Sequence, residues 1–573
     1  MSSLIVALDQ HNPKNIGENG HLQHGWSNNE GEKICQLYFQ LVRSKNHDSL
    51  ESNWTKILIS FMGNERENLR LFKIALKIVA NVRDIKNGKG EYQLSYTLLY
   101  VLHKYYPNIA KLTFLKFITM GNSIHCLGSF KDVKYFCNYI KTRELSEGHP
   151  FINYIVETVV YMLKEEEQIY IRKERNSLMA KWLPREKSKK YGWLFEKIAY
   201  VYYDYIIKTA KTSAKRCIAQ RKAKTLLRKL LAKINKKLNT TQIHMAGKTW
   251  SLIDFNEVTG PTLRINKKGF QNITKTNTQR SSSEDRVVCA LNLAKFIEDS
   301  KKGVKSVKGK RVDMYKLVKD AIGAQTTLEV DLVNEQWKDN SSETNEMSHF
   351  IIPMSDVSGS MCDDEMIPLY NSIGFGIRMS EKTHPDFRNR ILTFSDEPSW
   401  FKINEKMTFH EKVIAMKSDN NWGQSTNFYK ALELILNVCL ENNIPPTDVG
   451  KMILAIFSDM QINIAQGSSL NLLTMMENIK LMFSEAGMKS MWRKPYPVPH
   501  ILFWNLRKTN GFPNSVYEKN TTMISGYSPV LLNTFSEKGF QELKNITPFK
   551  MLEDILSNKN YNFIDIYCNN TFV

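Results

Sequence analysis

The stretch PMSDVSGSMCDDEM, residues 353–366, concentrates hydroxyl and carboxylate groups at one place in the chain. It overlaps the end of the apolar run FIIPMS, which predicts a buried strand, so DVSGSM is expected to form the loop at the carboxyl end of that strand. Asp356, Ser358 and Ser360 alternate, and Gly359 allows the loop to bend, so their oxygens can converge on one point. Oxygen ligands alone favour a hard cation such as Mg²⁺.

Two further predicted strand ends carry matching groups. Thr426 lies in GQSTNF, and Asp459 follows the apolar run KMILAIF. Because ligands of open α/β sheets bind at the carboxyl ends of the strands, we expect these side chains to complete one site for Mg²⁺ or Mn²⁺. The predicted metal ligands are Asp356, Ser358, Ser360, Thr426 and Asp459. The alternative is that these groups only cap helices and fix loops. The acids at 363–365 fit that alternative better, as first-turn acids of a helix.

The pattern DVSGS resembles the Asp-x-Ser-x-Ser signature of von Willebrand factor A domains, and Thr426 and Asp459 fall where the metal-ion-dependent adhesion site of that fold has its other threonine and aspartate. The resemblance implies that Ser358, Ser360 and Thr426 coordinate the metal directly, and that the two aspartates act mostly through water. It also implies that one coordination position is left for an acidic group of a partner protein.

The elements that would position this site are four short apolar runs, separated by segments of helix length. They are FIIPMS, RILTFS, KMILAIFS and HILFWNL. This alternation predicts a doubly wound α/β domain with a mostly parallel sheet, which we place at residues 346–573. The polar stretch QWKDNSSETNEM, 336–347, is expected to be a linker that marks the boundary.

The preceding part of the chain has a helical pattern. Phe72, Ala75, Leu76 and Val79 follow the spacing of one buried helix face, and similar stripes recur to about residue 240. We expect residues 31–345 to form a basic all-α domain with polar loops, built as a HEAT-like helical array. Residues 1–30 are expected to be disordered or extended.

The excess of basic over acidic residues is confined to this helical part. Residues 347–573 contain 21 Lys and Arg against 23 Asp and Glu, so the formal charge of +21 arises before residue 347. A basic surface favours polyanions such as nucleic acid. The most basic segment is the predicted helix at 205–240, followed by the loop KKGVKSVKGKR at 301–311. The predicted contacts to RNA or another polyanion are Lys215, Arg216, Arg221, Lys222, Lys224, Arg228, Lys229, Lys233, Lys236, Lys237, Lys308, Lys310 and Arg311.

Other interpretations of the basic helix remain open. The simplest is the solvated face of a packed helix, with leucines and Ile234 on the buried side. Phosphate binding comes second, and binding to a membrane surface or a partner helix third.

A helical array followed by this kind of α/β domain is similar to the plan of the TROVE proteins, typified by the Ro ribonucleoprotein, in which a helical ring binds structured RNA. Four segments, RDIKNGKGE (83–91), SFKDV (129–133), KWLPREKS (181–188) and GYS (526–528), resemble an uncharacterised domain-of-unknown-function family of plants and giant DNA viruses. In RDIKNGKGE the residue types predict a turn between helices, with Gly88 and Gly90 free to adopt positive φ. Fixing the loop is the first interpretation of this segment, and a functional contact through Arg83, Lys86 and Lys89 is the second.

Several other signals fail on inspection. MAGKTW lacks the first glycine of a phosphate-binding loop, since Gln242 stands there. His125, Cys126 and Cys137 lack a fourth zinc ligand. Ser358 has no nearby candidate base, and His500, at the start of a predicted strand, is expected to be a structural residue and not a member of a catalytic triad. The eight scattered cysteines are typical of free thiols in a reducing compartment, and neither a signal peptide nor a membrane span is expected. We therefore expect a cytoplasmic or nuclear protein, or a virion component, without integral membrane association.

The combined expectation is a non-enzymatic binding protein. The metal site would receive a carboxylate from a partner protein, and the basic helical domain would engage RNA or another polyanion. One alternative is an Mg²⁺-dependent phosphoryl-transfer enzyme, a phosphatase or nuclease, and another is a structural or virion scaffold. The hydroxyl-rich ligand set favours binding over catalysis.

Overall fold

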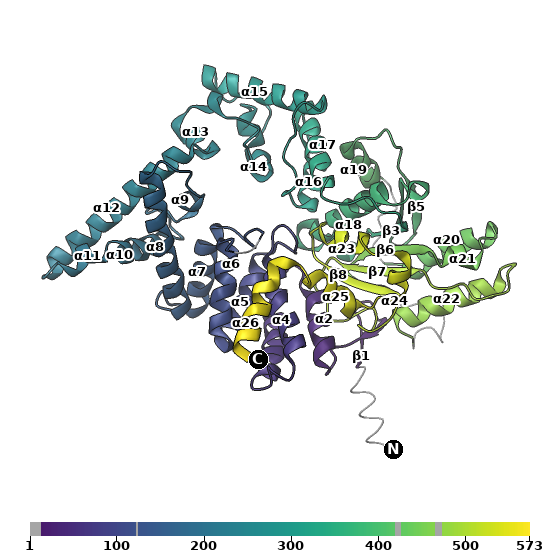
Figure 1. Ribbon diagram of the computed structural model, residues 1–573. Helices are drawn as coiled ribbons and strands as arrows, with labels where there is room; N and C mark the ends of the chain where they lie inside the picture. Colours follow the sequence, from purple (N-terminus) through teal and green to yellow (C-terminus); the bar gives the residue numbers. More distant parts are fainter. Residues whose placement is uncertain (1–12, 122–123, 419–425, 464–472, 573) are drawn as a thin grey trace.

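The structure is a computed structural model that describes residues 13–121, 124–418, 426–463 and 473–572. A helical array is followed by a six-stranded, mostly parallel sheet with helices around it. Figure 1 shows the array on the left and the sheet on the right. The predicted order of a helical part and an α/β part is confirmed.

The array is built from amphipathic helices joined by short turns. In α4 the predicted stripe of Phe72, Ala75, Leu76 and Val79 is buried, so the 3.6-residue spacing identified the core face correctly. The helices of the array are α2 (Glu30–Gln40), α3 (Asp48–Phe61), α4 (Leu69–Arg83), α5 (Gln93–Tyr105), α6 (Pro107–Ile118), α7 (Lys131–Glu144), α8 (Pro150–Ile171), α9 (Met179–Trp182), α10 (Gly192–Tyr202), α11 (Asp204–Lys208) and α12 (Ser213–Leu238). Within the described ranges, no helix is both long and apolar enough to cross a bilayer.

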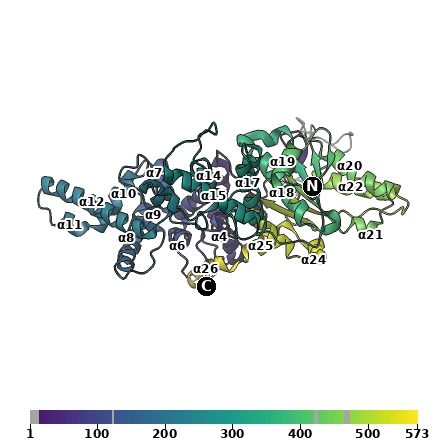
Figure 2. The ribbon, with the colours of Figure 1, turned by 90° about the horizontal axis from the view of Figure 1, so that it is seen from above.

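A second group of helices connects the array to the sheet. It consists of α13 (Thr241–Gly247), α14 (Gly260–Phe270), α15 (Glu284–Lys301), α16 (Met314–Ile322) and α17 (Thr327–Ser341). Residues of α14, α15 and α17 share a small hydrophobic core that includes Leu263, Phe270, Leu293 and Phe296. Figure 1 shows this group arching from α12 to the sheet, and Figure 2 shows α14 and α15 between the two parts from above.

The stretch QWKDNSSETNEM, which we expected to be a linker, begins inside a packed helix. Its first six residues belong to α17, and Trp337 stacks on Phe409 with ring centroids 3.8 Å apart. Asn340 donates to the carbonyls of Gly309 and Val312 at 3.1 and 3.0 Å. The linker prediction is wrong for residues 336–341, because they continue α17, and Gln336, Trp337 and Asn340 are buried with their contacts made within the fold.

The sheet contains the four predicted strands and two that the sequence pattern did not reveal. The order is β5-β4-β3-β6-β7-β8, parallel except for β5. The strands are β3 (Phe350–Asp356), β4 (Arg390–Phe394), β5 (Ser399–Lys402), β6 (Met452–Ser458), β7 (His500–Asn505) and β8 (Thr521–Ser525). β6, β7 and β8 are buried along their whole length, and β3 from its second residue on, because helices cover both faces of a parallel sheet.

Helices around the sheet complete the α/β part. α18 (Asp363–Lys382) packs on β3, β4 and β6, and α20 (Phe428–Glu441) packs on β4 and on α22 (Met475–Lys489). The other helices of this part are α19 (Phe409–Ser418), α21 (Pro446–Val449), α23 (Leu531–Ser536), α24 (Phe540–Asn545), α25 (Pro548–Leu556) and α26 (Asn562–Phe572).

The array and the sheet share one hydrophobic core. α2 and α25 pack against β8, and α26 returns to pack on α4 of the array. Lys89, which follows α4, is buried at this junction, and its ammonium donates to the carbonyls of Tyr38 and Leu41 at 2.8 and 3.0 Å and to the hydroxyl of Ser525 on β8. Burial holds the pKa of Lys89 well below its usual value. The side chain therefore ties the array to the sheet.

We expect Lys89→Met to lower the midpoint of thermal unfolding by several degrees. The substitution removes the donor to the buried carbonyl of Leu41, whereas the carbonyl of Tyr38 still accepts from Ser525, so the cost is roughly 1–3 kcal/mol. Lys86→Met in the same loop is the matched control, because Lys86 is exposed and its loss should change little. Equal midpoints for the two variants would show that Lys89 does not hold the junction together.

Candidate metal centre

Two neighbouring parallel strands bring the predicted metal ligands to one edge of the sheet. Asp356 is the last residue of β3, and Asp459 directly follows β6, which pairs with β3. The order of the sheet reverses between these strands, since β3 connects outward to β4 and β6 to β7. Open α/β sheets bind ligands at this position.

Hydrogen bonds join the residues of the DVSGS loop to one another. Asp356 Oδ1 accepts from the backbone N–H of Ser358 at 3.0 Å and from its hydroxyl at 2.6 Å. The hydroxyls of Ser358 and Ser360 lie 3.3 Å apart. Ser458, the last residue of β6, donates its hydroxyl to Asp356 Oδ2. The loop thus holds its oxygens close together.

Asp459 is joined to the same cluster. A hydrogen bond from the side chain of Ser360 favours the charged form of Asp459 and so lowers its pKa. Asp459 Oδ1 also accepts from the backbone N–H of Gln461 at 3.0 Å. Asp459 Oδ2 accepts from Arg507 Nε at 2.9 Å, and Arg507 also pairs with Glu18. Arg507 was missed by the sequence analysis, although it comes two residues after β7, a third strand end at this edge.

Thr426 is connected to this cluster through the segment that follows Asp459. It is buried, its carbonyl accepts from the backbone N–H of Asn463 at 3.1 Å, and its N–H donates to the side chain of Asn463 at 3.4 Å. The structure therefore links Asp356, Ser358, Ser360 and Asp459 by hydrogen bonds of their own and places Thr426 beside the same chain segment.

The electrostatics of the site are set by two buried carboxyl groups. Asp356 and Asp459 are both fully inaccessible to solvent. Burial raises the pKa of Asp356 to about 7, with a further contribution from the charge of Asp459. Burial also raises the pKa of Asp459, and the guanidinium of Arg507 opposes this shift. A nearby cation would stabilise both carboxylates in their charged form.

The donor set fits a hard cation of the magnesium type. The described part of the chain contains no group of three or more His, Cys, Asp and Glu side chains placed to hold a metal. The predicted set has only two carboxylates and depends on hydroxyl oxygens for the rest. Asp356, Ser358, Ser360 and Asp459 would hold such an ion, because their oxygens already gather at one point.

The N-terminal hairpin covers this edge of the sheet. β1 (Lys14–Ile16) pairs with β2 (Leu22–His24), and the turn between them places Glu18 against Arg507 and Gln461. The backbone N–H of Glu18 donates to Gln461 Oε1 at 2.7 Å, and Asn19 Nδ2 donates to the carbonyl of Gln461 at 2.7 Å. A carboxylate of this chain thus lies beside the candidate metal ligands.

Next to the site, the start of α18 departs from a regular helix. Asp364, Glu365 and Met366 have positive φ values of 48°, 60° and 63°. We expected the acids at 363–365 to occupy a regular first turn, and the left-handed backbone contradicts this for 364 and 365. Such a conformation is unfavourable for residues with a side chain, so the surrounding contacts must hold it in place.

The predicted polyanion contacts fall into two separate groups. The ten on α12 lie along a helix whose opposite side buries Leu227, Leu230, Leu231 and Ile234. All ten are exposed except Lys224, which pairs with Glu196 at 2.8 Å. Lys308, Lys310 and Arg311 lie in the loop between α15 and α16, on the sheet side of the arch in Figure 1.

Two of the three basic residues of the turn RDIKNGKGE have a structural role. Arg83 forms a fully buried pair with Asp132, with Nε and Nη2 each 2.9 Å from a carboxylate oxygen. Lys89 is the buried junction residue described above. Gly90 has a φ of +71°, whereas Gly88 lacks positive φ and lies so close to the carbonyl of Asn81 that a Cβ would be 2.0 Å from its oxygen.

His125 also has a structural environment. Its Nε2 lies 2.7 Å from Asp84 Oδ1, and Asn560 contacts the ring. Both contacts hold the loop that contains His125.

Comparison with known proteins finds one matching family model and one relative, and neither has a described activity. Residues 351–562 match the family model of a domain of unknown function, DUF7788. Over 545 residues the chain is 27% identical to "Uncharacterized protein L728" of Acanthamoeba polyphaga mimivirus, a match that covers 92% of this chain and 85% of that protein. No solved structure matches the chain. These findings agree with the expected resemblance to an uncharacterised family that has giant-virus members.

We expect the stability contributed by Asp356 to depend on pH. Its folded pKa of about 7 lies above the ordinary value of 3.8, so the folded state binds more protons between these values and stability falls as pH rises through that window. Without divalent cations, Asp356→Asn should therefore unfold at a higher temperature than the wild type at about pH 8, and the difference should shrink toward pH 4.

Thermal unfolding across this pH range measures the effect. Asp363→Asn is the control, because it removes a carboxylate from a neighbouring side chain that is 68% exposed. A pH-independent difference between Asp356→Asn and the wild type would contradict the buried-carboxyl interpretation.

Proposed function

We propose that this protein is a non-enzymatic binding protein whose α/β part is a von Willebrand factor A-like domain with an adhesion-type metal site. The observation that supports this most directly is the hydrogen-bonded cluster of Asp356, Ser358, Ser360 and Asp459 at the carboxyl edge of β3 and β6. The mostly parallel sheet with β3 near its centre is the scaffold that such a domain requires.

In this proposal the metal is Mg²⁺ or Mn²⁺, which when bound supplies a Lewis-acidic centre for an acidic group of a protein partner. The serine hydroxyls provide neutral ligands, so the site keeps a net attraction for an additional carboxylate. Arg507 favours binding over phosphoryl transfer, because its guanidinium is engaged with Asp459 and Glu18 instead of being free to hold a phosphate.

The second part of the proposal assigns polyanion binding, RNA first, to the exposed basic face of α12. Lys229, Lys233 and Lys236 are exposed, and within the described residues none of them has a carboxylate partner at ion-pair distance. Uncompensated cations on a long helix attract phosphates. A helical array that binds RNA beside an adhesion-type domain would correspond to the TROVE plan. The described cysteines are all free thiols, which suits the cytoplasm or nucleus, or a virion assembled there.

Addition of Mg²⁺ is expected to raise the thermal unfolding midpoint of the wild-type protein, because a ligand that binds only the folded state stabilises it. Ser358→Ala and Asp356→Ala should lose this response. Asp386→Ala, which removes an exposed carboxylate elsewhere on the domain, should keep it. An Mg²⁺ response of wild-type size in Ser358→Ala would remove the basis of the adhesion-type site.

The Mg²⁺-loaded protein should also release no phosphate from p-nitrophenyl phosphate, and steady release would favour the phosphoryl-transfer alternative.

Binding of a single-stranded RNA should weaken steeply with salt, and the variant Lys222→Gln/Lys229→Gln/Lys233→Gln should show a shallower dependence. Each lost phosphate contact reduces the slope of log K against log salt by about 0.7, so the slope should fall by about 2. Filter binding over a range of KCl concentrations measures it.

The matched control for this experiment is Lys406→Gln/Lys489→Gln/Lys519→Gln, which removes the same charge from exposed positions of the α/β part. Equal slopes for the two triple variants would place the RNA contacts elsewhere than on α12.

A further inference from the structure

The four segments that resemble the uncharacterised family, although distant in the sequence, meet around one pocket. Gly88 to Glu91 from the first segment, Lys131 from the second, Lys181 and Trp182 from the third, and Tyr527 from the last all line it. Its volume is about 590 Å³, within the range of small-molecule sites. The pocket lies between the array, the helices that connect the array to the sheet, and the segment after β8. We call it the basic pocket.

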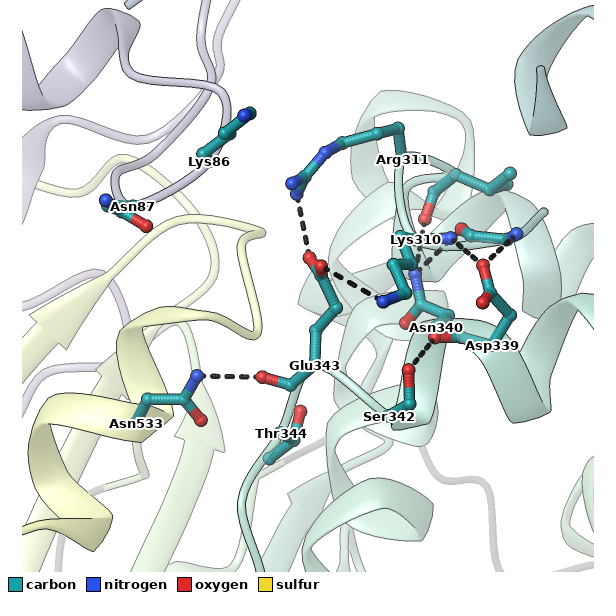
Figure 3. A network of polar contacts seen from close by, with 12 residues as sticks. Lys86, Asn87, Lys310, Arg311, Asp339, Asn340, Ser342, Glu343, Thr344 and Asn533 are labelled. Carbon is teal, nitrogen blue, oxygen red and sulfur yellow. Dashed lines mark hydrogen bonds and ion pairs between the residues drawn. The ribbon is translucent and has the colours of Figure 1, made fainter. Parts of the chain in front are cut away.

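The lining of the basic pocket carries an excess of positive charge. It contains seven lysines and arginines but three carboxylates, and all three carboxylates are already paired, Asp313 with Lys316 at 2.6 Å. Arg43 holds Glu91 at 3.0 Å on both oxygens, and Glu343 is shared by Lys310 at 3.9 Å and Arg311 at 2.8 Å. Figure 3 shows Lys310 and Arg311 converging on Glu343, with Lys86 on the facing side.

The array side of the pocket gathers ammonium groups around one indole ring. The Nζ atoms of Lys131, Lys181 and Lys134 lie 4.2, 5.1 and 5.4 Å from the ring centroid of Trp182. Within the described residues, these three lysines and the neighbouring Arg185 have no carboxylate at ion-pair distance. The indole face offsets part of the charge, but a cation–π contact is weaker than a carboxylate partner.

The environment therefore disfavours the protonated form of these lysines. Burial lowers the pKa of Lys131, Lys134 and Lys181, and the charge of Lys131 lowers the last two further. Arg83, which also forms part of the pocket wall and is fully buried, has one guanidinium nitrogen, Nη1, without a hydrogen-bond partner. The charge of Asp132 offsets part of this effect at Lys131. Like charges that are half-buried and have no carboxylate at ion-pair distance favour an anion as their partner.

We propose that the basic pocket binds a compact anion that carries several phosphate groups, such as the triphosphate chain of a nucleotide. Lys131 and Lys181 would take one end of the chain, and Lys310 and Arg311 the other. A single phosphate would engage only one of these walls, so the affinity should rise with the number of linked phosphates. This site uses neither α12 nor the metal centre, and it does not depend on the proposed function.

Isothermal titration calorimetry with tripolyphosphate, in buffer with EDTA and at fixed ionic strength, tests the proposal on the full chain. We expect Lys131→Gln/Lys181→Gln to weaken binding about tenfold or more, since charge-assisted hydrogen bonds to phosphate are lost. Lys489→Gln/Lys519→Gln removes the same charge from exposed positions of the α/β part and should bind like the wild type. Each single substitution is measured as well, so that a folding defect in the double variant does not hide the result.

A readout without ligand distinguishes loss of binding from loss of structure. Because Lys131 and Lys181 repel each other in the empty pocket, the double variant should unfold at the same temperature as the wild type or higher. Tripolyphosphate that binds the double variant as tightly as the wild type would overturn the proposal, and so would equal weakening in the control.

Two further ligands identify the source of the phosphates. ATP should bind with the same dependence on Lys131 and Lys181, and inorganic phosphate should bind more weakly than tripolyphosphate. A single-stranded RNA with a 5′-hydroxyl is the third probe. If this RNA binds in a manner that depends on Lys131 and Lys181, while tripolyphosphate and ATP do not bind, the assignment to a polyphosphate is overturned. The α12 variant should retain tripolyphosphate binding, so failure of the RNA proposal and failure of this one give different results.

Discussion

The return of the C-terminal helices onto the N-terminal array is the contact on which the basic pocket and the junction between array and sheet depend. Tyr561 donates its hydroxyl to Asp84 Oδ2 at 3.0 Å, and Asn560 contacts the ring of His125, which in turn contacts Asp84. The other oxygen of Asp84 accepts from the backbone N–H groups of Lys86 and Asn87. Residues near the end of the chain therefore fix the turn that forms one wall of the basic pocket and that carries Lys89 to the sheet.

Buried charges in this molecule divide into satisfied and unsatisfied groups, and the division separates structural from functional roles. Lys89 has three acceptors, and Arg83 is paired through Nε and Nη2 with Asp132 while its Nη1 has no partner, so both mainly stabilise the fold. Asp356 and Asp459 lie close together with pKa values raised by burial, and the guanidinium of Arg507 offsets part of their charge. A buried charge without full compensation is costly, which is why such groups mark places where a ligand of opposite charge is stabilised.

Local pattern was sufficient to predict much of this arrangement. Alternation of apolar runs with helix-length segments identified β3, β4, β6 and β7, and strand ends then pointed to Asp356 and Asp459. β5 was missed because it has only four residues and combines exposed with half-buried positions, and β8 because three of its five residues are Thr or Ser, so it forms no apolar run. Arg507 could have been found by the strand-end argument, but its pairing with Glu18 joins residues 489 positions apart. Pairings of this kind depend on tertiary packing, which no local pattern reports.

The same limit explains why the basic pocket was not predicted. Its segments are recognisable one by one, but only the fold of the whole chain brings them together. The loop after α2 shows how closely the two sites are then connected. Arg43 lines the basic pocket, while Lys45 pairs with Asp364 beside the DVSGS loop at 3.1 Å. The carbonyl of Asn46 accepts from Lys508, the neighbour of Arg507. Residues 43–46 thus connect the lining of the basic pocket to neighbours of the candidate metal ligands, so the two sites are adjacent parts of one body.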